Sequence, residues 1–162
     1  MIHLEKVTYK NEEEVLDLNI FKEQYPFVAD NSESLADAYI AITTEGCFAY
    51  PFAIYNDETL VGFLMIGYNV SAIDDEIESE TFNNNYLFWR FMIDKRYQKN
   101  GYGREAMRLA IEFVKSFPSG KAEYLVTSYN PENEVAKKLY SSFGFEENGE
   151  VDDGEVVALL KL

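Results

Sequence analysis

The residues best suited to chemistry lie between positions 94 and 104, where a strand-like segment gives way to a helix-like one. They read Asp94-Lys-Arg-Tyr-Gln98-Lys99-Asn100-Gly101-Tyr102-Gly103-Arg104. The first N–H groups of a helix lack intrahelical acceptors, and the helix dipole adds positive potential at that end. Glycines let the backbone approach a ligand without a Cβ in the way. We therefore predict that this turn binds a diphosphate, helped by the basic side chains of Lys95, Arg96, Lys99 and Arg104.

The spacing of the same residues also fits a second nucleotide-binding pattern. Gly101, Gly103 and Ala106 satisfy the relaxed dinucleotide fingerprint G-x-G-x-x-A, and Glu123 follows about twenty residues later. A nicotinamide-dependent oxidoreductase is therefore an alternative. Its fingerprint normally opens a run of parallel strands, whereas this one follows a predicted hairpin and lies beyond mid-chain.

Two blocks of residues together resemble a known family. Gln98-Lys-Asn-Gly101-Tyr-Gly103 is similar to the Q/R-x-x-G-x-G/A signature of GNAT acetyltransferases. Asn133, Ala136, Leu139-Tyr140 and Phe143-Gly144-Phe145 resemble that family's second block, about 30 residues downstream. Shorter segments (Phe27-Val28-Ala29, Ser34-Leu35-Ala36 and Ala38-Tyr39) look similar to bacterial spermine/spermidine (diamine) acetyltransferases. The resemblance implies an acetyl-CoA-dependent N-acetyltransferase.

The resemblance also implies roles for particular residues. The backbone of Phe91, Met92 and Ile93 would bind the pantetheine arm, and that of Gln98, Lys99, Asn100, Gly101, Tyr102, Gly103 and Arg104 would bind the pyrophosphate. Asn133 would hydrogen-bond the cofactor, or it is a local helix cap. Tyr140 would protonate the departing thiolate, because a phenol with a pKa near 10 is a suitable donor to sulfur; otherwise it is a core aromatic.

The acceptor is expected to be a cationic amine. The net charge is −15, from 14 Lys and Arg against 29 Asp and Glu, and acidic surfaces attract cations. Asp30, Glu33 and Asp37 are the candidate substrate-binding carboxylates and candidate general bases, and Tyr25, Phe27 and Tyr39 could contact the methylene chain. A polyamine is the favoured substrate. An aminoglycoside, an amino acid, or a protein lysine or N-terminus remains an alternative, as does a CoA-binding sensor without efficient transfer.

The elements that must position these residues alternate between strands and helices. We predict strands at 2–7, 48–55, 59–68, 86–93 and 122–128, with the second and third of them as a hairpin, and an acidic loop at 74–80. Phe145 and 156–160 supply the last predicted strands, joined by an acidic turn. Helices are predicted after Asn11, around Pro26, from Ser32 or Ser34, from Gly101, and from Asn130 with Val135, Ala136, Leu139, Tyr140 and Phe143 buried. This order predicts an α/β (α+β) fold, a mixed and mostly antiparallel sheet of six or seven strands flanked by about four helices.

The bulk properties restrict the class of protein. Its 162 residues suit one domain, expected to span 1–162, and the acidity argues against a nucleic-acid partner. No stretch is apolar enough for a membrane helix, so a cytoplasmic enzyme is expected. The lone cysteine, Cys47, is predicted to be a small strand residue rather than a nucleophile, and the lone histidine, His3, a strand-surface residue. We expect no metal, and the aromatic surplus suggests a homodimer.

Overall fold

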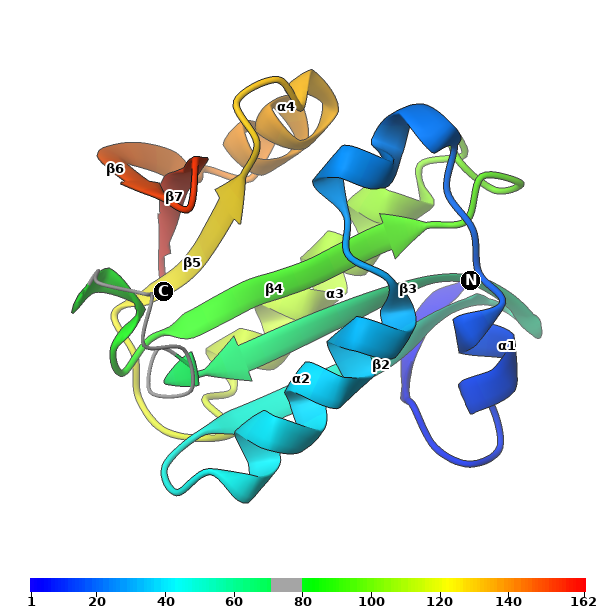
Figure 1. Cartoon of the computed structure of the whole chain (residues 1–162), viewed down its shortest axis with the longest axis horizontal. Helices are drawn as coiled ribbons and strands as arrows, with labels where there is room; N and C mark the ends of the chain where they lie inside the picture. The colour runs from blue at the N-terminus through cyan, green and yellow to red at the C-terminus, as the bar shows by residue number, and fades with distance from the viewer. Residues whose placement is uncertain (71–79) are drawn as a thin grey trace.

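The computed structural model describes residues 1–70 and 80–162 (Figure 1). The predicted acidic loop falls, apart from Glu80, outside these residues. In chain order the elements are β1 (Ile2–Lys6), α1 (Glu12–Leu16), η1 (Lys22–Phe27), α2 (Asn31–Thr43), β2 (Phe48–Asn56), β3 (Thr59–Tyr68), η3 (Glu80–Phe82), β4 (Tyr86–Ile93), α3 (Tyr102–Lys115), β5 (Tyr124–Tyr129), α4 (Glu134–Ser142), β6 (Glu146–Asp152) and β7 (Glu155–Lys161). None of the described helices is long and apolar enough to cross a bilayer.

The strands form one mixed sheet in the order β1-β2-β3-β4-β5-β7-β6, which confirms the predicted fold class. The predicted hairpin is β2 with β3, and the aromatic strand β4 lies at the centre, as its apolar composition indicated. Among the described strands, β4 and β5 are the one parallel pair, and they pair only at Tyr86 with Leu125 and Leu87 with Val126. Beyond these two pairs they diverge, so a gap in the sheet opens beside the second half of β4 (Figure 1).

Helices cover both faces of the sheet. On one face, α1 and α2 pack their buried residues, such as Val15 and Ala41, against Phe63 and Met65 of β3. On the other face, α3 and α4 pack residues such as Met107 and Tyr140 against Leu64 and Phe88. The two faces follow from the alternation of side chains along each strand. The sheet therefore separates one hydrophobic cluster, which it forms with α1 and α2, from another, which it forms with α3 and α4.

A β-bulge interrupts this alternation in β4. Met65 pairs with Arg90 and Ile66 pairs with Phe88, so Trp89 is an extra residue on β4. Before the bulge, Phe88 faces α3; after it, Phe91 and Ile93 face α3 and Met92 faces α2. The sequence alone predicted a regular strand here.

Helix starts are where the sequence predictions were least accurate. α2 begins at Asn31 after Asp30, not at Ser32 or Ser34, and the Ser34 hydroxyl donates to the Asp30 carbonyl. α4 begins at Glu134, and Asn133 rather than Asn130 caps it. Asn130 instead accepts a hydrogen bond from Glu132 N–H in the preceding turn. The polar side chains near each start could satisfy turn N–H groups as well as helix ones, which is why the cap was misassigned.

Val135 was also predicted wrongly. It is 74% exposed, whereas Tyr140 is buried and Ala136, Leu139 and Phe143 pack against the core from partly exposed positions. Because α4 begins later than predicted, only the side chains on its sheet-facing side are buried or partly buried. Gly144 follows the helix with φ +90°, as a glycine stop signal predicts.

Candidate active site

The N-terminus of α3 presents a row of unpaired backbone donors. Lys99 and Gly101 have positive φ values of 66° and 80°, which turn the chain sharply before the helix. No side chain caps α3, and within residues 1–70 and 80–162 the N–H groups of Gly101, Tyr102 and Gly103 meet no acceptor. Three free donors at the positive end of a 14-residue helix have the geometry that can bind an anion, and we call them the candidate anion site.

The basic side chains of this turn divide into two kinds. Arg96 is committed to Asp94, with 2.8 Å between Nε and Oδ1, whereas Lys95 and Lys99 are exposed. Arg104 Nη1 donates to Ser142 Oγ at 2.8 Å, and its guanidinium lies 4.8 Å from the centre of the Phe143 ring. A small pocket of about 220 Å³ lies here, lined by Gly101, Arg104, Glu105, Arg108 and Phe143. It extends the candidate anion site toward α4.

The Gln98 side chain does not point freely into the candidate anion site. Its Nε2 donates to the Ile93 carbonyl at 2.9 Å and to Gln24 Oε1 at 2.8 Å. Gln98 thus ties the end of β4 to η1. Its contribution to an anion is limited to its backbone, which is the part of Gln98 that the sequence assigned to the pyrophosphate.

The edge of β4 that faces the gap carries backbone groups of alternate residues. Asp94 N–H donates to Val61 O of β3 at 2.9 Å, and antiparallel pairing alternates, so the backbone of Met92 also faces β3. The backbone groups of Phe91 and Ile93 therefore face the gap, where the Ile93 carbonyl meets Gln98. Of the three residues predicted to bind pantetheine by their backbone, Phe91 and Ile93 direct their backbone groups toward the gap, and Met92 directs its backbone toward β3.

Tyr140 lies in an aromatic cluster on the α4 side of the gap. Its ring stacks on Tyr129 at 5.6 Å between ring centroids and makes edge contacts with Phe145 at 5.4 Å and Phe88 at 6.0 Å. Burial raises the pKa of Tyr140 to about 12, against a lowering contribution from the Thr127 hydroxyl. The phenol therefore stays protonated at neutral pH, which is the state a proton donor requires.

Asn133 serves as the side-chain cap of α4. Its Oδ1 accepts from Ala136 N–H at 3.1 Å. The side-chain oxygen is thus committed to the helix, so a cofactor hydrogen bond falls to its amide NH₂ group.

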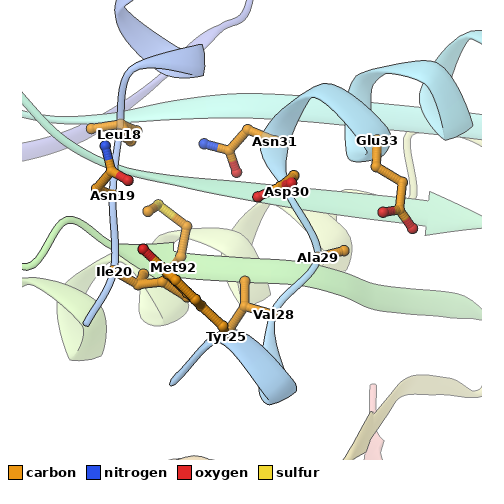
Figure 2. A pocket seen from close by; sticks show the side chains of 10 residues that line it. All are labelled: Leu18, Asn19, Ile20, Tyr25, Val28, Ala29, Asp30, Asn31, Glu33 and Met92. Atoms are coloured by element: carbon orange, nitrogen blue, oxygen red, sulfur yellow. The ribbon is translucent and has the colours of Figure 1, made fainter. Parts of the chain in front are cut away.

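A pocket of about 520 Å³ lies on the opposite face of the sheet, beneath the start of α2 (Figure 2). The segment before η1, the segment after it and the first turn of α2 surround it, and one residue of the sheet, Met92, forms its floor. Its lining residues are Leu18, Asn19, Ile20, Tyr25, Val28, Ala29, Asp30, Asn31, Glu33 and Met92. Neither Asp30 nor Glu33 forms an ion pair with any described residue, so the pocket is left with net negative charge.

The third predicted carboxylate lies outside this pocket. Asp37 Oδ2 forms an ion pair with Arg90 Nη2 at 3.1 Å, so its charge is compensated. Among the aromatics, Tyr25 lines the pocket, whereas Phe27 does not and Tyr39 is 63% exposed on α2. The sequence showed three equivalent acids on one helix; the structure separates two of them from the third.

Asp94 is a structural residue that the sequence did not single out. It is 1% exposed and accepts from the Asn19 N–H at 2.9 Å, from the Arg96 N–H at 2.9 Å and from the Arg96 guanidinium. Burial alone would raise the pKa of Asp94, but these hydrogen bonds outweigh it and lower the pKa below its usual value. Asp94 joins the pocket segment at Asn19 to the start of the anion-binding turn. Its position directly after a strand was the available signal.

The remaining candidates have structural surroundings. Cys47 is buried just before β2, its thiol donates to the Asn69 carbonyl, and burial raises its pKa, which makes it a poor nucleophile. His3 is exposed on the edge strand β1 and stacks on Tyr55. The dinucleotide alternative is contradicted by the sheet, because a single parallel pair among the described strands is not the parallel sheet that such a site requires.

Comparison with known proteins agrees with this geometry. The chain is 32% identical over 163 residues to the spermine/spermidine N(1)-acetyltransferase of Bacillus subtilis strain 168, and the match covers 99% of both chains. A probable spermine N(1)-acetyltransferase of Bacillus subtilis subsp. natto strain BEST195 is also 32% identical over 99% of both chains.

Solved structures share the fold at lower identity. An aminoglycoside acetyltransferase in complex with coenzyme A superposes with a TM-score of 0.78 at 16% identity, covering 99% of this chain and 95% of that one. The spermidine N-acetyltransferase of Vibrio cholerae, in complex with CoA and spermine, gives 0.66 at 16% identity, covering 99% and 94%. Residues 16–145 match the family model of the acetyltransferase (GNAT) family. The chain therefore belongs to the acetyltransferase (GNAT) family.

Proposed function

We propose that the protein transfers the acetyl group of acetyl-CoA to a primary amine of a polyamine such as spermidine or spermine. The observation that carries the proposal is the position of the two candidate sites on β4. The side chains of Phe91 and Ile93 lie next to Gly103, where an added Cβ would touch them, and Met92 between them lines the acidic pocket. A reaction that joins an anionic cofactor to a cationic acceptor needs such an arrangement. The names of the two Bacillus subtilis relatives support the same substrate class.

The residues present fit acetyl-CoA. The free N–H groups of Gly101, Tyr102 and Gly103 match a pyrophosphate, and a Cβ at Gly101 would point into open space where a ligand can approach. The backbone of Phe91 and Ile93 offers strand-like hydrogen bonds to an amide-containing arm in the gap beside β5. Acetyl-CoA supplies an acyl thioester, whose carbonyl carbon is the electrophile.

The acidic pocket fits a polyamine. Asp30 and Glu33 are uncompensated carboxylates that attract ammonium groups, and Tyr25 and Met92 offer apolar surface to the methylene chain. The incoming amine must lose a proton before it can attack. β4 carries no carboxylate and Asp94 is fully engaged, so the proton leaves through water toward Asp30 or Glu33.

Tyr140 is proposed as the general acid. As the amine nitrogen bonds to the carbonyl carbon, the carbon–sulfur bond breaks and the sulfur requires a proton. The buried phenol holds that proton at neutral pH because its pKa is raised to about 12. The cluster of Tyr129, Phe145 and Phe88 fixes the ring.

We also propose that the protein is a homodimer and that it is located in the cytoplasm. Tyr39, Ile40 and Ile42 are 63%, 50% and 59% exposed on α2, and this apolar surface supports a homodimer. The unpaired buried thiol of Cys47 suits the reducing cytoplasm. Light scattering of the purified protein measures its oligomeric state and so tests the homodimer.

Thiol release from acetyl-CoA, measured across a panel of acceptors, tests the function. The panel contains spermine, spermidine, short diamines, an aminoglycoside, a lysine peptide and a neutral amine. We expect the highest kcat/KM with spermine or spermidine. Faster turnover of the neutral amine or of the lysine peptide would contradict the polyamine assignment.

A further inference from the structure

Arg90 reaches the polyamine side of the sheet because of the β-bulge at Trp89. In a regular strand Arg90 would share the orientation of Phe88, which faces α3. The extra residue reverses that orientation, so Arg90 lies against α2 and its Nη2 meets Asp37. Its guanidinium also lies 5.5 Å from the centre of the Trp89 ring, and its Nη1 donates to the Trp89 carbonyl. Bulges often redirect a side chain in this way beside a functional site.

The two residues of the ion pair lie next to the acidic pocket on the two elements that border it, α2 and β4. From Glu33 to Asp37 is one helical turn, about 6 Å along α2, on the face that carries Asp30. From Met92 back to Arg90 is two residues, about 7 Å along β4. Asp30, Glu33 and Met92 line the pocket, and Asp37 and Arg90 do not. Asp37 and Arg90 therefore lie one step beyond the lining residues Glu33 and Met92.

The ion pair leaves the region beyond Glu33 without a free negative charge, because Arg90 compensates Asp37. Without Arg90, Asp37 would extend the acidic row of Asp30 and Glu33 by one more carboxylate. With Arg90 present, an ammonium group that reaches past Glu33 meets a compensated ion pair and gains no free carboxylate. The pair is partly solvated, with 22% of the Arg90 and 36% of the Asp37 side chain exposed, so it lies within reach of a ligand.

We propose that the Arg90–Asp37 ion pair is the residue pair that sets the polyamine length the pocket accepts, and that it disfavours the longer tetraamine spermine relative to spermidine. This inference rests on the proposed function and adds to it the element that decides between polyamines. The pair acts on the substrate by charge at the end of the pocket, not on the reacting atoms.

The test measures the ratio of kcat/KM for spermine to that for spermidine in four variants. Arg90→Gln frees Asp37, and we expect the ratio to rise about fivefold, the effect of one partly solvated charge contact. Arg90→Lys keeps the charge and is the matched control, with a ratio near that of the wild type. Asp37→Asn leaves Arg90 without its counter-ion and should lower the ratio. The double variant Arg90→Gln/Asp37→Asn removes both charges and should return the ratio toward the wild-type value.

The outcomes separate this inference from the proposed function. Absence of spermidine-dependent thiol release in the wild type would overturn the function. Normal wild-type turnover with an unchanged ratio in Arg90→Gln and Asp37→Asn would overturn the length-selection role alone. Asp37 receives a single hydrogen bond from Arg90, and Arg90 Nε has no acceptor among the described residues. The substitutions therefore do not remove a bidentate ion pair. If Arg90→Gln lowers the melting temperature sharply, the test rests on Asp37→Asn, in which the spermine-to-spermidine ratio of kcat/KM is expected to fall. An unchanged ratio in that variant would then overturn the length-selection role.

Discussion

The anion-binding turn before α3 and the acidic pocket lie on either side of Phe91, Met92 and Ile93 of β4, yet they are built differently. The turn is one continuous segment whose donors are backbone N–H groups at the start of α3. The pocket is assembled from separate segments of the first 33 residues and one strand residue, and its charge comes from side chains. One site therefore depends on backbone conformation, and the other depends on which side chains tertiary packing brings together.

The two regions also differ in how they recognise charge. Backbone donors at a helix start cannot be removed by substituting a side chain, so the turn is altered only by changing its conformation. The pocket carboxylates act individually and through water, so each contributes modestly and is screened by salt. Substitutions in the two regions should thus differ in size and in the kinetic parameter that they change.

The largest effect is expected at Tyr140 of α4, in the aromatic cluster beside the gap. Tyr140→Phe removes the proposed proton donor and should lower kcat about 100-fold, while the Kd for CoA and the melting temperature change little. The ring keeps its contacts with Tyr129 and Phe145, so packing is preserved. Steady-state kinetics and calorimetry measure these quantities. Retention of wild-type kcat would assign Tyr140 to the core alone.

Asp94→Asn should break the connection between the two regions. Asp94 holds the Asn19 N–H and the Arg96 guanidinium, and weakening these buried contacts should cost about 1–3 kcal/mol of unfolding free energy at pH 7.

The effect of Asp94 should depend on pH. Its folded pKa lies below the ordinary value, so the carboxylate stabilises the fold above pH ~4 and loses that effect as the pH falls through the folded pKa. Urea unfolding at several pH values should show the difference between wild type and Asp94→Asn shrinking in acid. A difference that stays constant with pH would contradict the assignment.

A substitution at Gly101 changes the conformation of the turn. With φ at +80°, an alanine is strained by about 1–2 kcal/mol, and the Kd for CoA should rise about tenfold as the donors shift. Gly149→Ala is the matched control, because Gly149 lies in β6 with φ +88°, and a Cβ added there would meet no described atom within 4 Å. Equal changes of CoA affinity in both variants would argue against an anion site at Gly101.

The smallest effect is expected in the pocket. Glu33→Gln should raise the KM for spermidine about threefold with little change in kcat, and high salt should reduce the difference. Glu14→Gln removes the same charge from an exposed position of α1 and should leave the KM unchanged. Similar effects of both substitutions would show that only net charge matters.

The difference between the two regions also explains what the sequence could predict. The strand-to-helix turn before α3 could be predicted because its glycines and its helix start are local patterns that carry their own geometry. β2, β3 and β4 were placed within a residue by their apolar runs. The helix caps Asp30 and Asn133 were missed because several nearby Ser and Asn side chains fit the same signal.

The pocket could be predicted only in part. Composition indicated acidic residues on the second helix, but nothing local distinguished Asp37 from Asp30 and Glu33. That distinction depends on Arg90, which is 53 residues away in sequence and reaches Asp37 only because of a bulge that the residue pattern does not show. The burial of Asp94 likewise depends on Asn19, 75 residues away. Long-range contacts of this kind require the folded structure.

The most direct test of the proposed reaction is thiol release from acetyl-CoA with spermidine, measured in parallel for wild type, Gly101→Ala, Glu33→Gln and Tyr140→Phe. We predict spermidine-dependent release by the wild type and one altered parameter in each variant: the KM for acetyl-CoA, the KM for spermidine and kcat, respectively. No spermidine-dependent release by folded, CoA-binding wild-type protein would contradict the proposed reaction.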